Sequence, residues 1–331
     1  MSADTPAATS ATGAPDTASD TGASDAASDT GASDAASDTA GLRQRIDTTK
    51  AHPARVYDVF LGGKDNYPAD RQAASMALKA NPRGHLDVRH NRDFVRRAVT
   101  ALAGEVGIRQ FLDIGTGLPT QQNVHQIAQA IAPDSQIVYV DNDPIVLVHA
   151  QALLTSGPQG RTDYIEADLR DPAKILEAAR RTLDFDRPIA LVLAAVLHFI
   201  EDEEAYPVVR QLVEALPSGS HLVLSHLSAD LNPVPINKVA DTFRKRGFSF
   251  VLRRREEIGR FLSDNGLEPL EPGIVPSRHW RPDHAADATE ARGAAPEHLE
   301  ELDHLDQGQY VSIAEATDED VNIFVTVARK P

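Results

Sequence analysis

Two glycines and an acidic residue lie together where an apolar run of the chain meets a predicted helix. The segment reads FLDIGTGLPT over residues 111–120, with Asp113 near the end of the apolar run and Gly115 and Gly117 directly after it. Glycines at such a junction permit a tight turn and a close approach of a ligand to the backbone, and the amides that enter the next helix face that ligand. The spacing predicts a nucleotide-binding loop, which also includes Thr116 between the glycines.

Two side chains of this loop indicate which nucleotide it binds. A dinucleotide fingerprint needs a third glycine at position 120, where this chain has Thr120. A carboxylate at Asp113 repels a pyrophosphate but attracts an ammonium and a sulfonium, both of which S-adenosylmethionine (SAM) carries. The loop therefore favours SAM, and a nicotinamide-dependent oxidoreductase is kept as a less favoured alternative.

Two further acids follow the next two apolar runs. Asp141 closes the run in IVYVDNDP, where a carboxylate would accept both ribose hydroxyls of an adenosine, and Asn142 beside it joins the predicted cofactor set. Asp168 closes the run in DYIEADL and is placed for the exocyclic amine of adenine, while Leu169 offers a backbone amide to the ring. The competing interpretation of Asp168 alone is a helix N-cap.

The elements that position these acids alternate between short apolar runs and helical windows. This order predicts right-handed crossovers and a mainly parallel, doubly wound α/β sheet. Strands are expected at residues 110–114, 136–141, 162–166, 189–193, 221–225 and 322–328, with extended chain at 267–274. Helices are expected at residues 121–132, 144–154, 173–183, 203–216, 236–246 and 255–265, and a short one at 296–304.

A helical region precedes the glycine loop over residues 42–104. Apolar residues recur there at a spacing of three to four, namely Phe94, Val95, Ala98, Val99, Leu102 and Ala103. The arginines off this stripe, Arg89, Arg92, Arg96 and Arg97, are predicted to form a solvated face. Of these, Arg89 and Arg92 are weaker candidates for binding the carboxylate of SAM.

The sequence VFLGGKDNYPADR interrupts this helical region over residues 59–71. Its glycines, among them Gly62, indicate a bend or a close approach. We interpret the segment as a lid over SAM, with Lys64 or Asn66 reaching the SAM carboxylate and Tyr57 near its methyl group. The alternative is an interhelix loop in which Asn66 is a cap and Tyr57 belongs to the core.

Histidines near strand ends are the candidates for a general base. His198 follows the fourth predicted strand and His226 the fifth, at the edge where crevices of such sheets lie. Methyl transfer does not require a base, since orienting the acceptor and excluding water supply much of the acceleration. His298 and His304 suggest a metal, but no metal-binding motif surrounds them, and we expect no metal site.

Composition limits the classes of partner. The 331 residues carry a formal charge of −16 and no cysteine, which excludes disulfides and thiolate chemistry and disfavours nucleic acid and anionic membranes as partners. Without a long apolar run or a signal-like start, the protein is expected to be cytoplasmic and to act on a small molecule. The sequence does not indicate an oligomeric state.

Longer motifs resemble a family of actinobacterial SAM-dependent methyltransferases long classed as a domain of unknown function. They are ARVYDVFLGGKDNYPADR, NRDFVRRAV, GIRQFLDIGTGLPTQQNVH, VYVDNDPIVLVHA, VLHFI and GSHLVLSH. The resemblance runs over about residues 48–282 and resumes near residue 321. It implies a class I methyltransferase fold, with strand order 3-2-1-4-5-7-6, an antiparallel last strand and an N-terminal helical cap.

The expected organisation has three parts and one insertion. An acidic Ala/Ser/Asp/Thr/Gly repeat at 1–40 is expected to be disordered, a helical cap spans 41–106, and a SAM-binding domain spans 107–331. Residues 283–320 are expected to be a surface insertion that tolerates deletion. Such a protein is a methyltransferase of a small-molecule acceptor or, alternatively, a non-catalytic SAM-binding sensor.

Deleting residues 1–40 is expected to leave both the melting temperature and the affinity for SAM nearly unchanged. The segment holds seven Asp, no Lys or Arg and only Met1 as a large apolar residue, so it has little to bury. Thermal melts and calorimetric titration of the truncated and full chains test this. A large loss in either quantity would show that the tail is structural.

Overall fold

The computed structural model describes residues 47–119, 122–153, 159–283 and 298–331. The tail predicted over residues 1–40 lies outside these parts, as does Thr120 of the glycine loop.

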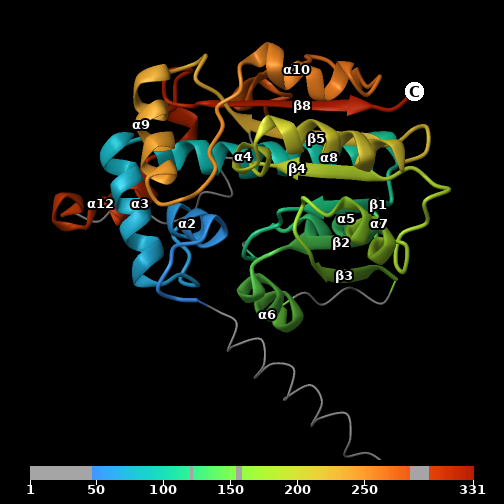
Figure 1. Cartoon of the computed structure of the whole chain (residues 1–331), viewed down its shortest axis with the longest axis horizontal. Helices are drawn as coiled ribbons and strands as arrows, with labels where there is room; N and C mark the ends of the chain where they lie inside the picture. Colours follow the sequence, from blue (N-terminus) through green and yellow to red (C-terminus); the bar gives the residue numbers. More distant parts are fainter. Residues whose placement is uncertain (1–46, 120–121, 154–158, 284–297) are drawn as a thin grey trace, which may run out of the picture. The chain divides into compact units, whose positions relative to one another are not determined.

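An eight-stranded sheet lies at the centre of the described chain (Figure 1). Its order is β3-β2-β1-β4-β5-β8-β6, with β7 also paired to β8. Strands β1 to β5 are parallel and β8 is antiparallel to β5. This confirms the predicted order and the antiparallel last strand; the short β7 is additional. The strands are β1 Gln110–Ile114, β2 Gln136–Asp141, β3 Arg161–Glu166, β4 Ala190–Ala194, β5 His221–Leu227, β6 Glu268–Pro269, β7 Val275–Pro276 and β8 Ile323–Arg329.

Helices cover both faces of this sheet. Because successive strand residues point to opposite faces, Leu112 and Ile114 of β1 enter one core cluster and Phe111 enters the other. The first cluster packs against α7 Pro172–Ala179, α8 Asp202–Glu214 and α10 Arg255–Ser263, and the second against α4 Gly84–Ala101 and α5 Val124–Ile131. Helix α6 Pro144–Leu153 connects β2 to β3.

The N-terminal cap consists of α2 Pro53–Phe60, α3 Pro68–Ala80 and α4, which continues into the π-type turn η1 Leu102–Val106. Helices α2 and α3 pack on α9 Pro233–Arg244 and share a third core cluster with it (Figure 1). The cap is therefore joined to the sheet from two sides, through α4 on one face and through α9 near one end.

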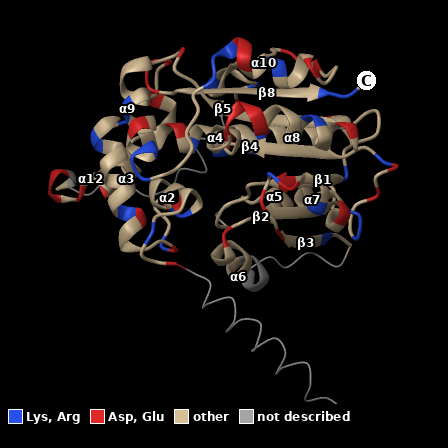
Figure 2. Cartoon of the chain, in the orientation of Figure 1, with Lys and Arg blue, Asp and Glu red and all other residues tan. Residues whose placement is uncertain are grey.

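Charged residues of both signs occur in the helices and loops, while most of the strand residues are uncharged (Figure 2). Among the residues that the structure describes, no helix combines the length and the apolar character needed to cross a membrane.

Two of the arginines predicted to be solvated are buried. The apolar stripe of α4 is buried as predicted, but Arg96 and Arg97 are only 9% and 4% exposed. Arg97 donates to the carbonyl oxygens of Trp280 and, at 2.9 Å, Ser277, and it pairs with Asp93 at 3.0 Å. Arg97 is therefore a structural link between α4 and the chain near Trp280.

Some residues in the described part of the insertion are buried, although the sequence predicts a surface segment. The helix predicted at 296–304 begins outside the described residues. From residue 298 on, the chain contains the turn η4 Leu299–Glu301, the one-turn helix α12 His304–Gln307 and the short turns η5 Gly308–Tyr310 and η6 Ile313–Glu315. Ile313 and Ala316 are buried in the second core cluster. We therefore expect that deleting this described part would open that cluster, against the predicted tolerance.

Replacing Ile313 with Ala is expected to lower the free energy of unfolding by about 2–4 kcal/mol, because a buried aliphatic side chain would leave a cavity. Chemical denaturation of both proteins measures the difference. Glu315→Ala in the same turn is the matched control: its side chain is exposed and the change should stay within about 0.5 kcal/mol. Equal stability of the Ile313 variant and the wild type would contradict the packing described here.

Candidate active site

A cavity of about 430 Å³ lies where the parallel strands end beneath the cap. Ligand pockets of proteins typically begin at about 300 Å³. Its walls come from α2, α3, α4 and α9 and from the segments that follow β1 to β4. Ten of the predicted site residues line it: Tyr57, Asp113, Gly115, Thr116, Gly117, Asp141, Asn142, Asp168, Leu169 and His198.

The glycine loop adopts the conformation that its sequence predicts. Gly115 and Gly117 have φ angles of 78° and 68°, in the left-handed region that disfavours other residues. A Cβ on Gly115 would lie 2.6 Å from the Val196 side chain, whereas one on Gly117 would meet nothing within 4 Å. Thr116 closes the turn by donating its hydroxyl to the Asp113 carbonyl at 3.0 Å. The backbone at Gly117 is thus open to a ligand.

The carboxylate of Asp141 is held in place by two backbone amides. Gly117 N–H donates to one oxygen at 2.8 Å and Asp143 N–H to the other at 2.9 Å. Burial raises the pKa of Asp141, and these two hydrogen bonds oppose the rise. Each oxygen keeps a free lone pair, so the group can accept the two hydroxyls of a ribose without moving.

The carboxyl group of Asp113 is buried against the cavity at 8% exposure. Burial raises its pKa to about 7; Arg92 opposes this rise, Asp141 adds to it, and no hydrogen bond contributes. A carboxylate in this position gains most from a cationic ligand, because the ligand supplies the counter-charge that burial has removed. That Asp113 binds the ammonium of SAM therefore stays a prediction, with which the burial of this carboxyl is compatible.

Asn142 and Asp168 line the cavity where β2 and β3 end. Asn142 donates its side-chain amide to Asp168 at 3.0 Å, and Arg170 donates its backbone N–H to the same carboxylate at 2.9 Å. Burial raises the pKa of Asp168, but the hydrogen bonds from Arg170 and Asn142 outweigh it, so the pKa is lowered overall. The N-cap of α7 is Asp171, which leaves Asp168 on the cavity wall.

Tyr57 belongs to a hydrogen-bonded chain that joins the cap to the sheet. Its hydroxyl donates to the Val88 carbonyl at 3.1 Å and accepts from the Asn91 amide at 2.9 Å. The Asn91 oxygen accepts from the Ser225 hydroxyl of β5 at 2.5 Å, and Ser225 accepts from the Ala195 N–H at 2.8 Å. Burial raises the pKa of Tyr57, so the side chain is a neutral phenol on the cavity wall.

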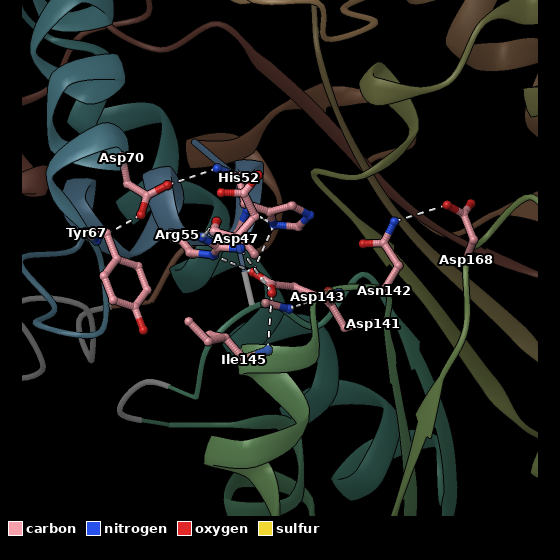
Figure 3. Close-up of polar contacts among 12 residues, drawn as sticks. Asp47, His52, Arg55, Tyr67, Asp70, Asp141, Asn142, Asp143, Ile145 and Asp168 are labelled. Atoms are coloured by element: carbon pink, nitrogen blue, oxygen red, sulfur yellow. Dashed lines mark hydrogen bonds and ion pairs between the residues drawn. The ribbon is translucent and has the colours of Figure 1, made fainter. Parts of the chain in front are cut away.

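A buried ion pair beside the cavity was not predicted from the sequence. Arg55 of α2 binds Asp143 through two nitrogens, at 2.8 and 3.3 Å, and His52 lies 3.2 Å from the same carboxylate (Figure 3). Asp143 also accepts the Ile145 N–H at 3.1 Å, at the start of α6. An acid just before Pro144 was the only signal in the sequence, and it predicts a helix start without identifying a partner.

The structure does not bring Gly62, Lys64 or Asn66 to the cavity. Lys64 is exposed, and Asn66 donates its amide to Asp58 at 2.9 Å and to the Gly63 carbonyl at 3.0 Å. The interruption between α2 and α3 exists as predicted, but its polar groups bind one another around the buried Asp58. We therefore withdraw these three residues as cofactor contacts.

The two candidate histidines have different surroundings. His226 does not line the cavity; its Nδ1 donates to the Leu227 carbonyl at 2.7 Å and its Nε2 accepts from Arg253 at 2.8 Å. Burial and Arg253 lower its pKa to about 3, so it cannot act as the predicted base. His198 lines the cavity at 4% exposure, and its Nδ1 has no hydrogen-bond partner in the described structure. Burial, with His226 and Arg253, lowers its pKa well below the ordinary value.

In the described parts of the chain, no three His, Asp or Glu side chains are grouped in a way that would hold a metal ion. His304 instead contacts the Ser75 hydroxyl at 2.9 Å.

The strand order, the left-handed glycine loop and the acids at successive strand ends define a class I methyltransferase architecture. The family model described as S-adenosyl methyltransferase matches residues 39–331, and the chain belongs to that family. SAM is accordingly its cofactor, and the nicotinamide alternative has no support. No curated protein matches the chain.

Two solved structures resemble the chain closely. A DUF574 family protein from Streptomyces avermitilis is 45% identical, with a TM-score of 0.76 over 86% of this chain and 99% of that one. A candidate methyltransferase from Thermobifida fusca is 38% identical, with a TM-score of 0.71 over 88% of this chain and 97% of that one. Both sources agree with the actinobacterial family that the sequence motifs indicate.

Replacing Asp141 with Ala is expected to weaken SAM binding by roughly 1.5–3 kcal/mol, because charge-assisted hydrogen bonds to the ribose are lost. Calorimetric titration measures the affinity. Asp134→Ala removes an exposed carboxylate that pairs only with Arg109 and should leave the affinity unchanged. An Asp141 variant that melts normally and binds SAM as the wild type does would refute the ribose assignment.

The affinity for SAM is expected to fall as the pH is lowered through 7. A cationic ligand binds the ionised form of Asp113, whose pKa is about 7 in the unliganded protein, so affinity should drop roughly eightfold between pH 7.5 and 6. Titrations across this range measure the slope. The Asp113→Asn variant should bind more weakly and show a flatter profile, and an unchanged slope in that variant would assign the dependence to another group.

Proposed function

We propose that the protein transfers the methyl group of SAM to a small organic acceptor that binds in the same cavity. The observation that carries this proposal is the continuity of the cavity. The predicted cofactor residues at the strand ends and a second, apolar set of residues on α2, α3 and α9 line one space. A cofactor and an acceptor that fill one continuous space can meet without water between them.

The cofactor half of the cavity is assigned residue by residue. Asp141 holds the ribose hydroxyls, Asp168 and Leu169 contact the adenine, and Asp113 binds the ammonium. Arg92 lines the cavity and lowers the pKa of Asp113. It supplies the positive charge that binds the carboxylate of SAM. Bound SAM supplies a methyl group on a positively charged sulfur, which makes that carbon open to attack by an acceptor lone pair.

The residues of the chain contribute position and exclusion of water. Tyr57 and Asn91 link the cap to the sheet over the Asp113 end of the cavity, through a chain of hydrogen bonds that fixes both side chains. Neither histidine is basic enough to remove a proton efficiently at neutral pH. Catalysis in this proposal therefore depends on holding the acceptor in line with the methyl group. The cytoplasmic location stays a prediction from the sequence.

Incubation of the protein with methyl-labelled SAM and a cell extract is expected to place label in the low-mass fraction. The Asp141→Ala variant is the control, and it should transfer label more slowly at the same SAM concentration. Label in macromolecules alone would contradict a small acceptor. SAM binding without any labelled product, over repeated extracts, would favour the alternative of a SAM-binding sensor.

A further inference from the structure

Half of the phenylalanines of this chain gather on one side of the cavity. The chain has ten, and five of them line the cavity: Phe60, Phe199, Phe243, Phe248 and Phe250. The rings of Phe199, Phe243, Phe248 and Phe250 contact one another, with centroids 5.0 Å apart for Phe243 and Phe250 and 5.4 Å for Phe199 and Phe250, and Phe60 packs against the same cluster. In a chain with only 5% aromatic residues, this is a local concentration of ring surface.

These rings belong to the third core cluster, yet they enclose a space. Phe243 and Phe250 are 5% and 2% exposed, and they pack with Ile236 and Val239 of α9, which also line the cavity. The atoms that line an empty apolar space lack partners for dispersion contacts, and water binds poorly there. An apolar ligand that fills the space is therefore favoured.

Two residues that line this cavity each have a side-chain nitrogen with no hydrogen-bond partner among the described residues. They are Asn81, through its amide nitrogen, and His198, through Nδ1, and both atoms are buried. Asn81 is 6% exposed and lies at the α3–α4 junction, while His198 packs its ring against Phe199 and Phe250, with centroids 4.3 and 5.1 Å apart. Buried polar atoms are normally paired, so a ligand with an oxygen atom is expected to pair them.

The aromatic side of the cavity also carries little charge. Besides the cofactor acids and two arginines, the titratable residues on its described walls are Tyr57, Asp87, His198 and His52, the last of which lies beside Asp143. Burial raises the pKa of Asp87 to about 7, against hydrogen bonds from Asn322, and lowers that of His198 well below its ordinary value. No lysine lines the described cavity, and Arg92 and Arg170 lie with the cofactor residues. An anionic acceptor would lose its hydration there without gaining a counter-ion, and the Asp87 carboxyl is already hydrogen-bonded to Asn322.

We propose that the acceptor is an uncharged, hydroxyl-bearing aromatic molecule, bound between the phenylalanine rings with its hydroxyl oriented by His198 or Asn81. This rests on the proposed function and specifies its substrate class. A hydroxyl suits both polar atoms, because it can accept from the Asn81 amide and can accept from or donate to a neutral imidazole. A purely aliphatic molecule would leave both atoms unpaired.

Binding of 2-naphthol to the full chain, saturated with S-adenosylhomocysteine, tests the proposal by fluorescence titration. We expect 2-naphthol to bind at least tenfold more tightly than 6-hydroxy-2-naphthoate, which adds a charge, and more tightly than naphthalene, which lacks the hydroxyl. Absence of 2-naphthol binding, or tighter binding of the naphthoate, would overturn the proposal.

Two variants test whether 2-naphthol binds in the aromatic part of the cavity. Phe248→Asp, in the loop after α9 and half-buried, should weaken 2-naphthol at least tenfold and leave S-adenosylhomocysteine affinity unchanged. Val234→Asp on α9, where the side chain is 65% exposed, is the matched control and should change neither affinity. If both variants bind 2-naphthol as the wild type does, the molecule binds elsewhere and the proposal fails.

A second pair of variants tests the polar contact. His198→Phe keeps the ring packing and should abolish the preference for 2-naphthol over naphthalene, and His198→Asn should restore part of it. If His198→Phe keeps the preference, the double variant His198→Phe, Asn81→Leu must lose it. A double variant that still prefers 2-naphthol would show that neither side chain orients the hydroxyl. A labelled product that is charged or non-aromatic would leave methyl transfer established and overturn this substrate class alone.

Discussion

The buried ion pair between Arg55 and Asp143 joins the cap to the sheet, and the geometry of the cavity depends on it. Both side chains are almost fully buried, at 4% and 1% exposure, so neither has water to replace its partner. Asp143 also accepts the Ile145 N–H and donates its own N–H to Asp141. The start of α6, the carboxylate of Asp141 and the first cap helix are therefore fixed by one residue. A shift of the cap would disturb the cofactor half of the site directly.

The cavity is divided electrostatically. Its cofactor half has carboxylates that burial makes reluctant to ionise, Asp113 above all, and a cationic ligand removes that penalty. Its other half is aromatic, and burial keeps the His198 ring there in its neutral form. Interactions between the ligand cation and these acids are stronger in such surroundings than in water. The same desolvation that favours SAM would disfavour an anionic acceptor, so one physical effect acts on both ligands.

The parts of the fold that were predicted correctly rest on local patterns. Apolar runs that close on an acid identify strand ends, and parallel strands bring those ends to one edge, which is why Asp113, Asp141 and Asp168 line one cavity. The errors concern partners distant in sequence. Arg97 reaches the chain near Trp280, and Arg55 reaches Asp143 across 88 residues. Periodicity cannot show such pairs, because an arginine off an apolar stripe has the same pattern whether it is solvated or bound to a distant carbonyl.

The described part of the insertion contacts helices that form walls of the cavity. Gln309 donates its side-chain amide to the Phe60 carbonyl at 3.0 Å, at the end of α2, and Arg89 of α4 donates to the Val311 carbonyl. The segment thus holds the end of α2, and α2 forms one wall of the aromatic half. Ile313 packs in the core and keeps the segment in place. A change of sequence at 308–313 can therefore alter the aromatic wall without touching the cofactor residues. This arrangement allows the acceptor preference to vary while SAM binding is retained.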